Sequence, residues 1–264
     1  MIKWWQTIKV HWSNTLVYRV NFLLMVVGPV LVFFFVKISL WYSIFQGDAE
    51  IRIGNYSLSE MLTYHLWTMI LMLISRSYNF GKLSEDIRLG RVSTYLIYPF
   101  SLYEFQVTNF LSRLFIQLFI GVLSLVFLLT VFPQFFNGFE TTSFAKGMVL
   151  AILVGFFWFS LQYLIGLMTF WLEETWVLAV IAETIIQLLS GNIIPLDLFP
   201  EWAAEMLAYT PFPYVTFVPV KTFMGTGDGF LLAIINLVFW TALLNLLILF
   251  VWRKGLKLYT GAGM

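Results

Sequence analysis

The chain contains six long apolar stretches, each close to the length of a helix that crosses a lipid bilayer. About 20 consecutive apolar residues in helical form span the hydrocarbon core. Every backbone amide inside lipid must be bonded within the protein, so we expect the stretches to be helices. The sequence therefore predicts an all-α integral membrane protein with six transmembrane helices. These predicted spans lie at about 21–44, 57–77, 108–132, 147–171, 176–196 and 230–252.

Composition supports this class and limits the number of domains. Of the 264 residues, 60% are hydrophobic and 11% are charged, and the mean hydropathy is +0.86. These values lie far outside the range of soluble domains. Six spans and their loops use the available length, so residues 21–264 are predicted to form a single transmembrane domain.

Several kinds of chemistry are excluded by the residues that the chain lacks. It has no cysteine and only two histidines, His11 and His65, so we expect neither disulfides nor a metal site. A glycine-rich phosphate loop ending in Lys-Ser or Lys-Thr is also missing, so ATP cannot bind in that manner. The net charge of +1 comes from scattered basic residues, which gives no reason to expect nucleic acid as a partner.

The first 20 residues have the pattern of a helix that lies in the headgroup layer. Trp4, Trp5 and Trp12 alternate with the cations Lys3 and Lys9 at helical spacing. A cleavable signal would carry a short apolar core here instead. Residues 1–20 are therefore predicted to be an interfacial amphipathic helix.

The basic residues predict the orientation of the spans. With the N-terminus in the cytoplasm, ten cations fall inside and three outside, which is the bias that the positive-inside rule describes. We therefore expect a multi-pass protein of the cell inner (plasma) membrane with both termini cytoplasmic. The inner set is Lys3, Lys9, Arg19, Arg76, Lys82, Arg88, Arg91, Arg253, Lys254 and Lys257, and the outer set is Arg52, Lys146 and Lys221.

Residues 76–106 form the longest polar interruption of the chain, on the predicted cytoplasmic side. Leu83 and Ile87 are four residues apart, which predicts a short amphipathic helix that ends at Gly90. Its predicted outer face carries charged residues, so we interpret it as a surface for a soluble partner. The alternative is a segment that only connects two helices. The charged residues of this face are Glu85, Asp86 and Arg88.

Prolines divide the predicted outer segment between spans five and six. Five of the chain's eight prolines lie here, and they leave apolar pieces shorter than a span. We expect one short helix near 199–209, with Pro200 in its first turn. The five are Pro195, Pro200, Pro211, Pro213 and Pro219.

Three ionisable residues fall inside predicted spans: Lys37, Arg113 and Glu183. A charge in lipid costs about 2.5–3.5 kcal/mol even on the lenient insertion scale, so each is a functional candidate. Lys37 and Arg113 lie near span ends, where long side chains reach the headgroups. Glu183 has a shorter reach and a depth similar to that of Arg113, so we expect these two to pair.

Several short motifs in this order resemble those of the type-2 permease family of ATP-binding-cassette exporters, in its branch of small six-span permeases. They cover the chain nearly end to end. In that branch an acidic residue usually follows the glycine that ends the motif Ile87-Arg88-Leu89-Gly90, whereas this chain has Arg91-Val92-Ser93 at that place. The motifs are Tyr18-Arg19-Val20-Asn21-Phe22, Ile87-Arg88-Leu89-Gly90 with Leu96-Ile97-Tyr98-Pro99, Pro211-Phe212 with Pro219, and Gly255-Leu256-Lys257-Leu258-Tyr259 with Gly261.

The resemblance implies a permease subunit of an exporter, driven by a separate cytoplasmic dimer of ATP-binding subunits that hold the ATP and magnesium. It implies a second permease copy, identical or related, an N-terminal elbow helix, and an outer gate of broken helices containing Pro195, Pro200, Pro211 and Pro213. It also implies a coupling helix between spans two and three that contacts the ATPase. The coupling residues are Leu83, Glu85, Asp86, Ile87, Arg88, Gly90 and Arg91.

Two alternatives belong to other functional classes. A membrane-embedded enzyme acting on lipid-linked substrates would need carboxylates or histidines that converge at one interface. The candidates are Glu173, Glu174, Glu183 and His65. The second alternative is an assembly or anchoring protein without transport, which would not stimulate an ATPase.

Overall fold

The structure is a computed structural model that describes residues 28, 35–48, 50–76, 80–97, 101–136 and 140–259. Within these residues every regular element is a helix, and the one β-bridge joins Ile53 to Tyr56 in a turn. The predicted interfacial helix at 1–20 lies outside the described residues. Most of the predicted first span does too, and its described part is the apolar helix Phe35–Ile44.

Four helices are long and apolar enough to cross a membrane. They are α3 (Leu58–Ser75), α6 (Leu102–Val131), α7 (Thr141–Leu167, continued by the 3-10 turn Met168–Phe170) and α12 (Phe230–Leu258). They correspond to the second, third, fourth and sixth predicted spans. The multi-pass, all-α class predicted from the sequence is therefore confirmed.

The starts of α3 and α6 are set by matching capping boxes. Ser57 accepts a hydrogen bond from the Glu60 amide while the Glu60 carboxylate accepts one from the Ser57 amide. Ser101 and Glu104 repeat this arrangement at the start of α6. Each box satisfies two amides that have no partner inside the helix. The cap at Ser101 explains why α6 begins six residues before the predicted boundary at 108.

The predicted fifth span, 176–196, is wrong at its C-terminal boundary, because the observed helix ends earlier. Helix α8 (Trp176–Leu189) has 14 residues, so it is about 21 Å long, which is less than the bilayer core. It ends where Ser190 and Gly191 form a turn, and Gly191 has a φ of +83° that an L side chain rarely adopts. Residues 190–196, which the prediction included in the span, belong to this turn and the segment after it.

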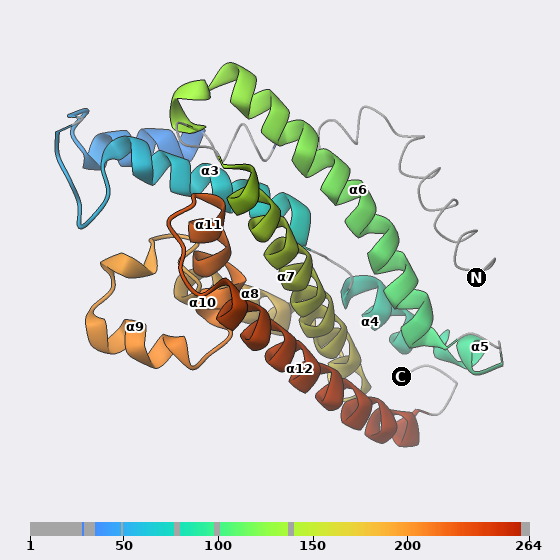
Figure 1. Ribbon diagram of the computed structural model, residues 1–264. Helices are drawn as coiled ribbons and strands as arrows, with labels where there is room; N and C mark the ends of the chain where they lie inside the picture. The colour runs from blue at the N-terminus through green and yellow to red at the C-terminus, as the bar shows by residue number, and fades with distance from the viewer. Residues whose placement is uncertain are drawn as a thin grey trace.

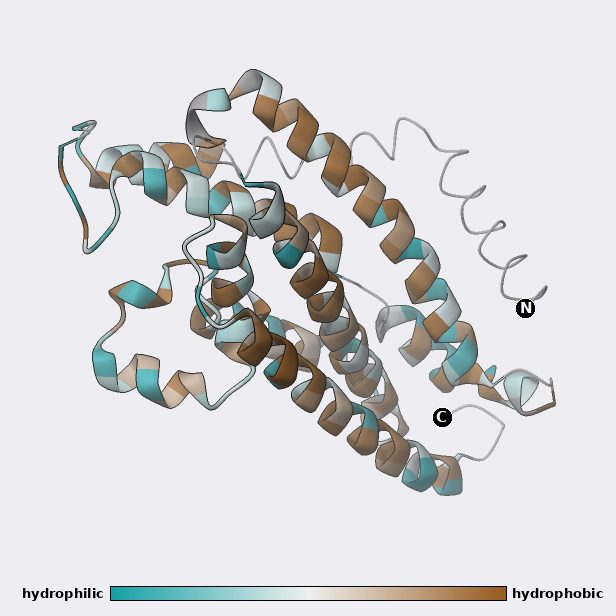
Figure 2. Ribbon diagram, viewed as in Figure 1, coloured by the Kyte–Doolittle hydropathy of each residue, from teal (hydrophilic) through white to brown (hydrophobic). Residues whose placement is uncertain are grey.

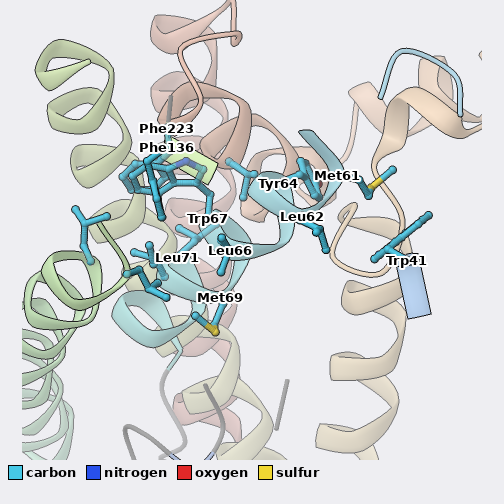
Figure 3. Close-up of a cluster of buried hydrophobic side chains, with 14 of the residues drawn as sticks. Trp41, Met61, Leu62, Tyr64, Leu66, Trp67, Met69, Leu71, Phe136 and Phe223 are labelled. Carbon is cyan, nitrogen blue, oxygen red and sulfur yellow. The ribbon is translucent and has the colours of Figure 1, made fainter. Parts of the chain in front are cut away.

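Helix α7 lies at the centre of the molecule and packs against α3, α4, α11 and α12 (Figure 1). One cluster of buried apolar side chains surrounds α3 (Figure 3). There the indole of Trp67 stacks on the ring of Phe223, with centroids 4.8 Å apart and planes 4° apart. Phe136 meets the same indole edge-on at 5.5 Å. Three segments distant in sequence are thus joined around one tryptophan.

Helices α6 and α12 expose most of their surface although both are strongly apolar. Only 11% of the apolar window of α12 and 33% of that of α6 is buried, against 61% for α7. The exposed side chains are large and apolar, such as Phe119, Leu231 and Phe239. In water such a surface would drive aggregation. It is instead the surface expected of helices that face lipid or another membrane subunit.

The polar elements gather at the two ends of the long helices (Figures 1 and 2). At one end lie α4 (Phe80–Arg88), α5 (Val92–Ile97) and the C-terminal end of α12. At the other lie the loop before α3 and α9 (Glu201–Ala208). The latter end also holds α11 (Phe217–Phe223), and α10 (Phe212–Val215) precedes it in the chain.

Gly147 on α7 gives a direct test of this packing. A Cβ atom built there would lie 2.3 Å from Cδ1 of Phe223, whose ring is held against Trp67. We expect Gly147→Ala to lower the free energy of unfolding by about 1–3 kcal/mol, because an overpacked core must shift. Thermal unfolding of the purified protein measures this. Gly81→Ala is the control, since a Cβ there meets nothing within 4 Å, and an equal effect of both variants would contradict the packing.

Candidate functional site

Helix α4 buries one face against the chain itself. Leu83 and Ile87 are each 1% exposed and belong to an apolar cluster with Leu167 and Phe170 of α7 and its 3-10 extension. The close approach depends on Gly166, because a Cβ there would lie 2.7 Å from Cδ2 of Leu83. The amphipathic pattern predicted from Leu83 and Ile87 is therefore present, and its apolar side faces inward.

The other face of α4 is charged and open. Glu85, Arg88 and Arg91 have about half of their side-chain surface exposed. Arg91 forms an ion pair with Glu85, and Arg88 lies 3.4 Å from a carboxylate oxygen of Glu174 in the loop before α8. Exposed pairs of this kind contribute little to stability, about 0–1 kcal/mol. These side chains can therefore be recruited by a partner without disrupting the fold.

Asp86 does not lie on this open face, which corrects the prediction. It is 3% exposed, its Oδ1 lies 3.2 Å from Nε of Arg91, and its Oδ2 has no hydrogen-bond partner among the described residues. Burial raises the pKa of this carboxyl, against the opposing effect of Arg91. Asp86 lies three residues after Leu83 and next to Ile87, so the helical repeat places it on the same inward face as these two residues.

Gly90 ends α4 as predicted, and its backbone is buried. It has a φ of +71°, the left-handed conformation in which many helices end. Of the seven predicted coupling residues, the structure thus places Glu85, Arg88 and Arg91 on the surface. It buries Leu83, Asp86, Ile87 and Gly90. Leu89, which the sequence argument did not include, is 57% exposed beside Arg88.

Glu183 pairs with a different cation from the one predicted. Its Oε2 lies 2.6 Å from a guanidinium nitrogen of Arg76, at the end of α3, and about one fifth of each side chain is exposed. Gln162 of α7 approaches the other carboxylate oxygen at 3.4 Å. Gln117 of α6 donates to the carbonyl of Arg76 at 2.6 Å. Four helices therefore meet in one polar cluster.

The prediction that Arg113 is the partner of Glu183 is wrong because similar depth does not ensure a shared helix face. Arg113 lies on the exposed side of α6, whereas Gln117 of the same helix faces the cluster. The sequence places Arg76 at the predicted cytoplasmic edge and gives no signal that it is the partner of Glu183. Its position one residue after α3 lets its side chain reach α8.

Lys37 lies at the opposite end of the bundle, as predicted. Its Nζ donates to the carbonyl of Ile193, 3.3 Å away, just after the end of α8. This contact gives Lys37 a structural role at that end of the bundle.

The prolines of the outer segment occupy positions where a missing amide hydrogen costs little. Pro200 and Pro211 are the N-cap residues of α9 and α10, and Pro213 lies in the first turn of α10. Pro195 is the N-cap of the 3-10 turn Leu196–Leu198. First-turn amides have no partner within a helix. The predicted division into short helices is therefore observed, with Pro200 one position earlier than expected.

A polar contact in this outer region was missed by the sequence argument. The hydroxyl of Tyr56 donates to Oδ2 of Asp197 at 2.6 Å, and Nζ of Lys221 lies 2.9 Å from the same oxygen. Lys221 also lies 4.8 Å from the centroid of the Tyr56 ring. Burial, and then the Asp197 carboxylate, raise the pKa of the Tyr56 hydroxyl. No sequence signal connects residues 141 positions apart.

The groups proposed for a membrane enzyme do not converge. Glu174 has 62% of its side chain exposed beside Arg88, whereas Glu183 is held by Arg76. His65 is 3% exposed in the core, stacked on Trp41 at 5.5 Å. Across the described ranges, no three or more His, Asp or Glu side chains come together as a metal-binding group. The arrangement therefore gives no support to that alternative.

A family comparison decides between the remaining classes. Residues 20–263 match the model of the family described as "ABC-2 family transporter protein". The chain belongs to the ABC-2 transporter family. No curated protein and no solved structure matches it. The family match confirms the resemblance seen in the motifs, and it gives this multi-pass membrane protein the role of an ABC-2 permease.

Proposed function

We propose that this ABC-2 permease is the transmembrane subunit of an exporter driven by a separate cytoplasmic ATPase. The observation that carries the proposal is α4: a short helix with its apolar face seated on α7 and its charged face open. A helix held in this way moves with the transmembrane core when a partner pushes on its exposed face. ATP and magnesium are bound by the partner subunits, and this chain supplies the membrane path.

The distribution of charge supports a cytoplasmic position for α4. Arg88 and Arg91 belong to the α4–α5 segment, and Arg253, Lys254 and Lys257 belong to the C-terminal end of α12, which lies at the same end of the bundle (Figure 1). Cations are concentrated in the cytoplasmic loops of inner-membrane proteins. We therefore assign this end, and both termini, to the cytoplasm of a cell whose plasma membrane holds the protein.

A second permease copy completes the transport path. Only 11% of the apolar window of α12 is buried, and α8 exposes Trp176, Val180 and Ile181. We count six spans by taking Phe35–Ile44 and α8 as parts of the first and fifth, and we propose that one such chain does not enclose a path alone. We infer that two copies, identical or related, face each other, with the remaining apolar surface in lipid.

The cycle follows from these assignments. Binding of ATP closes the ATPase dimer and displaces α4, and the long helices tilt because α4 is packed on α7. The path between the two copies then changes its opening at the outer end. There the broken helices that begin at Pro195, Pro200 and Pro211 form the gate, with Pro213 in the first turn of α10.

Purification from native membranes in mild detergent tests this function. We expect an ATP-binding subunit to copurify with the tagged chain and to hydrolyse ATP faster in the complex than alone. A catalytic-site substitution in the copurified ATPase is the control for contaminating hydrolysis. A permease that is pure, folded and free of any ATP-binding companion under these conditions would refute the proposal.

A further inference from the structure

The last described residue of the chain reaches back to the turn that joins α4 to α5. The hydroxyl of Tyr259 donates to the carbonyl of Gly90 and accepts a hydrogen bond from the amide of Ser93 at 3.1 Å. These partners lie 169 and 166 positions away in the sequence. One phenol therefore connects both sides of the turn that follows the charged face of α4.

The C-terminal end of α12 is itself fixed in position, so Tyr259 is more than a loose tail. The ring of Phe170, after α7, meets Trp252 at 5.9 Å and Tyr259 at 6.3 Å, both edge-on. Gly255 makes this possible, because a Cβ atom there would lie 2.2 Å from Phe170. The resulting aromatic contact holds Tyr259 in the place where its hydroxyl bridges the turn.

The α4 segment is therefore attached both to α7 and to the end of α12. The side chain of Leu83, in the first half of α4, packs against Gly166 of α7. The Gly90 carbonyl, just past its end, is bonded to Tyr259 at the end of α12. Glu85 and Arg88 lie between these two points, and Arg91 directly follows the second. A displacement of this face is thus passed to α7 at one point and to α12 at the other.

We propose that Tyr259 is a positioning residue that couples the α4–α5 segment to α12. The proposal rests on the function proposed above, in which α4 receives the movement of the ATPase. Through the Tyr259 hydroxyl, displacement of α4 pulls on the cytoplasmic end of α12. That helix is 29 residues long and continuous, so the movement reaches its outer end. Without the hydroxyl, α4 still binds the ATPase but moves independently of α12.

The variant Tyr259→Phe isolates the hydroxyl, because the ring that packs on Phe170 remains. The first measurement is amide hydrogen exchange of the peptide covering residues 90–95, on the full chain in lipid nanodiscs. We expect exchange to be about fivefold faster in the variant, since the Ser93 amide loses the Tyr259 oxygen and keeps only the longer bond to the Gly90 carbonyl, at 3.4 Å. Unchanged exchange would overturn the proposal. Because no ATPase is present, this result is independent of the proposed function.

The second measurement separates positioning from a merely structural role. A spin label at Leu231→Cys, 68% exposed at the outer end of α12, reports movement when ATP and vanadate are added to the copurified complex. We expect Tyr259→Phe to bind the ATPase as well as the parent does, while this movement falls at least about fivefold. Retained movement of α12 would overturn the proposal and leave the permease function standing.

A matched control uses a tyrosine at the opposite end of the molecule. Tyr209, at the end of α9, is 85% exposed. Tyr209→Phe removes the same hydroxyl group from the same residue type. We expect it to change neither the exchange of residues 90–95 nor the ATP-driven movement at residue 231. Equal effects of the two variants would show that the response is not specific to Tyr259, which also contradicts the proposal.

Discussion

Replacing Arg88 by glutamate is expected to weaken binding of the copurifying ATPase by at least about tenfold while the permease still folds and inserts. Arg88 has 47% of its side chain exposed at the centre of the charged face of α4. Reversal of a charge that meets an opposite charge across an interface costs several kcal/mol, which exceeds a factor of ten. Titration of the ATPase onto permease in nanodiscs measures the change.

A charge swap separates this role from the contact of Arg88 inside the chain. Arg88 lies 3.4 Å from Glu174, so the double variant Arg88→Glu with Glu174→Arg restores the internal pair with its charges exchanged. We expect the double variant to bind the ATPase as poorly as Arg88→Glu alone. Recovery of binding would show that Arg88 acts through Glu174, and the docking surface would then be wrongly assigned.

The largest effect on stability is expected for Glu183→Ala. The change leaves the guanidinium of Arg76 without the carboxylate that lies 2.6 Å away in the interior of four helices. Breaking a buried pair on one side costs about 3–5 kcal/mol. Because about one fifth of each side chain is exposed, we expect a loss of about 2–4 kcal/mol in the free energy of unfolding. Thermal unfolding in nanodiscs measures it.

Two further variants test whether the loss of stability comes from breaking the pair between Arg76 and Glu183. In Arg76→Met with Glu183→Leu both charges are removed, and we expect most of the lost stability to return, since no unpaired charge remains. Arg52→Ala breaks an exposed pair with Glu60, whose side chains are 56% and 49% exposed, and should cost no more than about 1 kcal/mol. The account of this cluster fails if Glu183→Ala behaves like Arg52→Ala.

Most of the fold could be predicted from the lengths of the apolar runs and the positions of the prolines. The runs at 57–77, 108–132, 147–171 and 230–252 each became a long helix, because a stretch of that hydropathy has no other stable form in lipid. The boundaries depended on local chemistry. The capping box of Ser101 and Glu104 starts α6 earlier than the predicted boundary, and the turn at Gly191 ends α8 before the predicted end of the fifth span. Hydropathy does not register either effect.

The sequence could predict only those features of the candidate site that depend on a single helix. The repeat of Leu83 and Ile87 placed the apolar face of α4 correctly. The same periodicity places Asp86, three residues after Leu83, on that buried face, so its burial could also have been predicted from the sequence. The Arg76 and Tyr259 contacts join segments far apart in the chain. Such contacts are set by the packing of several helices, which periodicity in a single segment cannot describe.

Crosslinking from α4 is the most direct test of the central claim that this face receives a separate ATPase. The chain has no cysteine, so Leu89→Cys, at a side chain 57% exposed beside Arg88, gives a single attachment point. Met206→Cys on α9, 66% exposed, is the matched point at the opposite end. In native membranes we predict that a short thiol crosslinker captures the ATP-binding subunit from residue 89 and not from residue 206. Capture from residue 206, or from neither position in an assembled complex, would contradict the account.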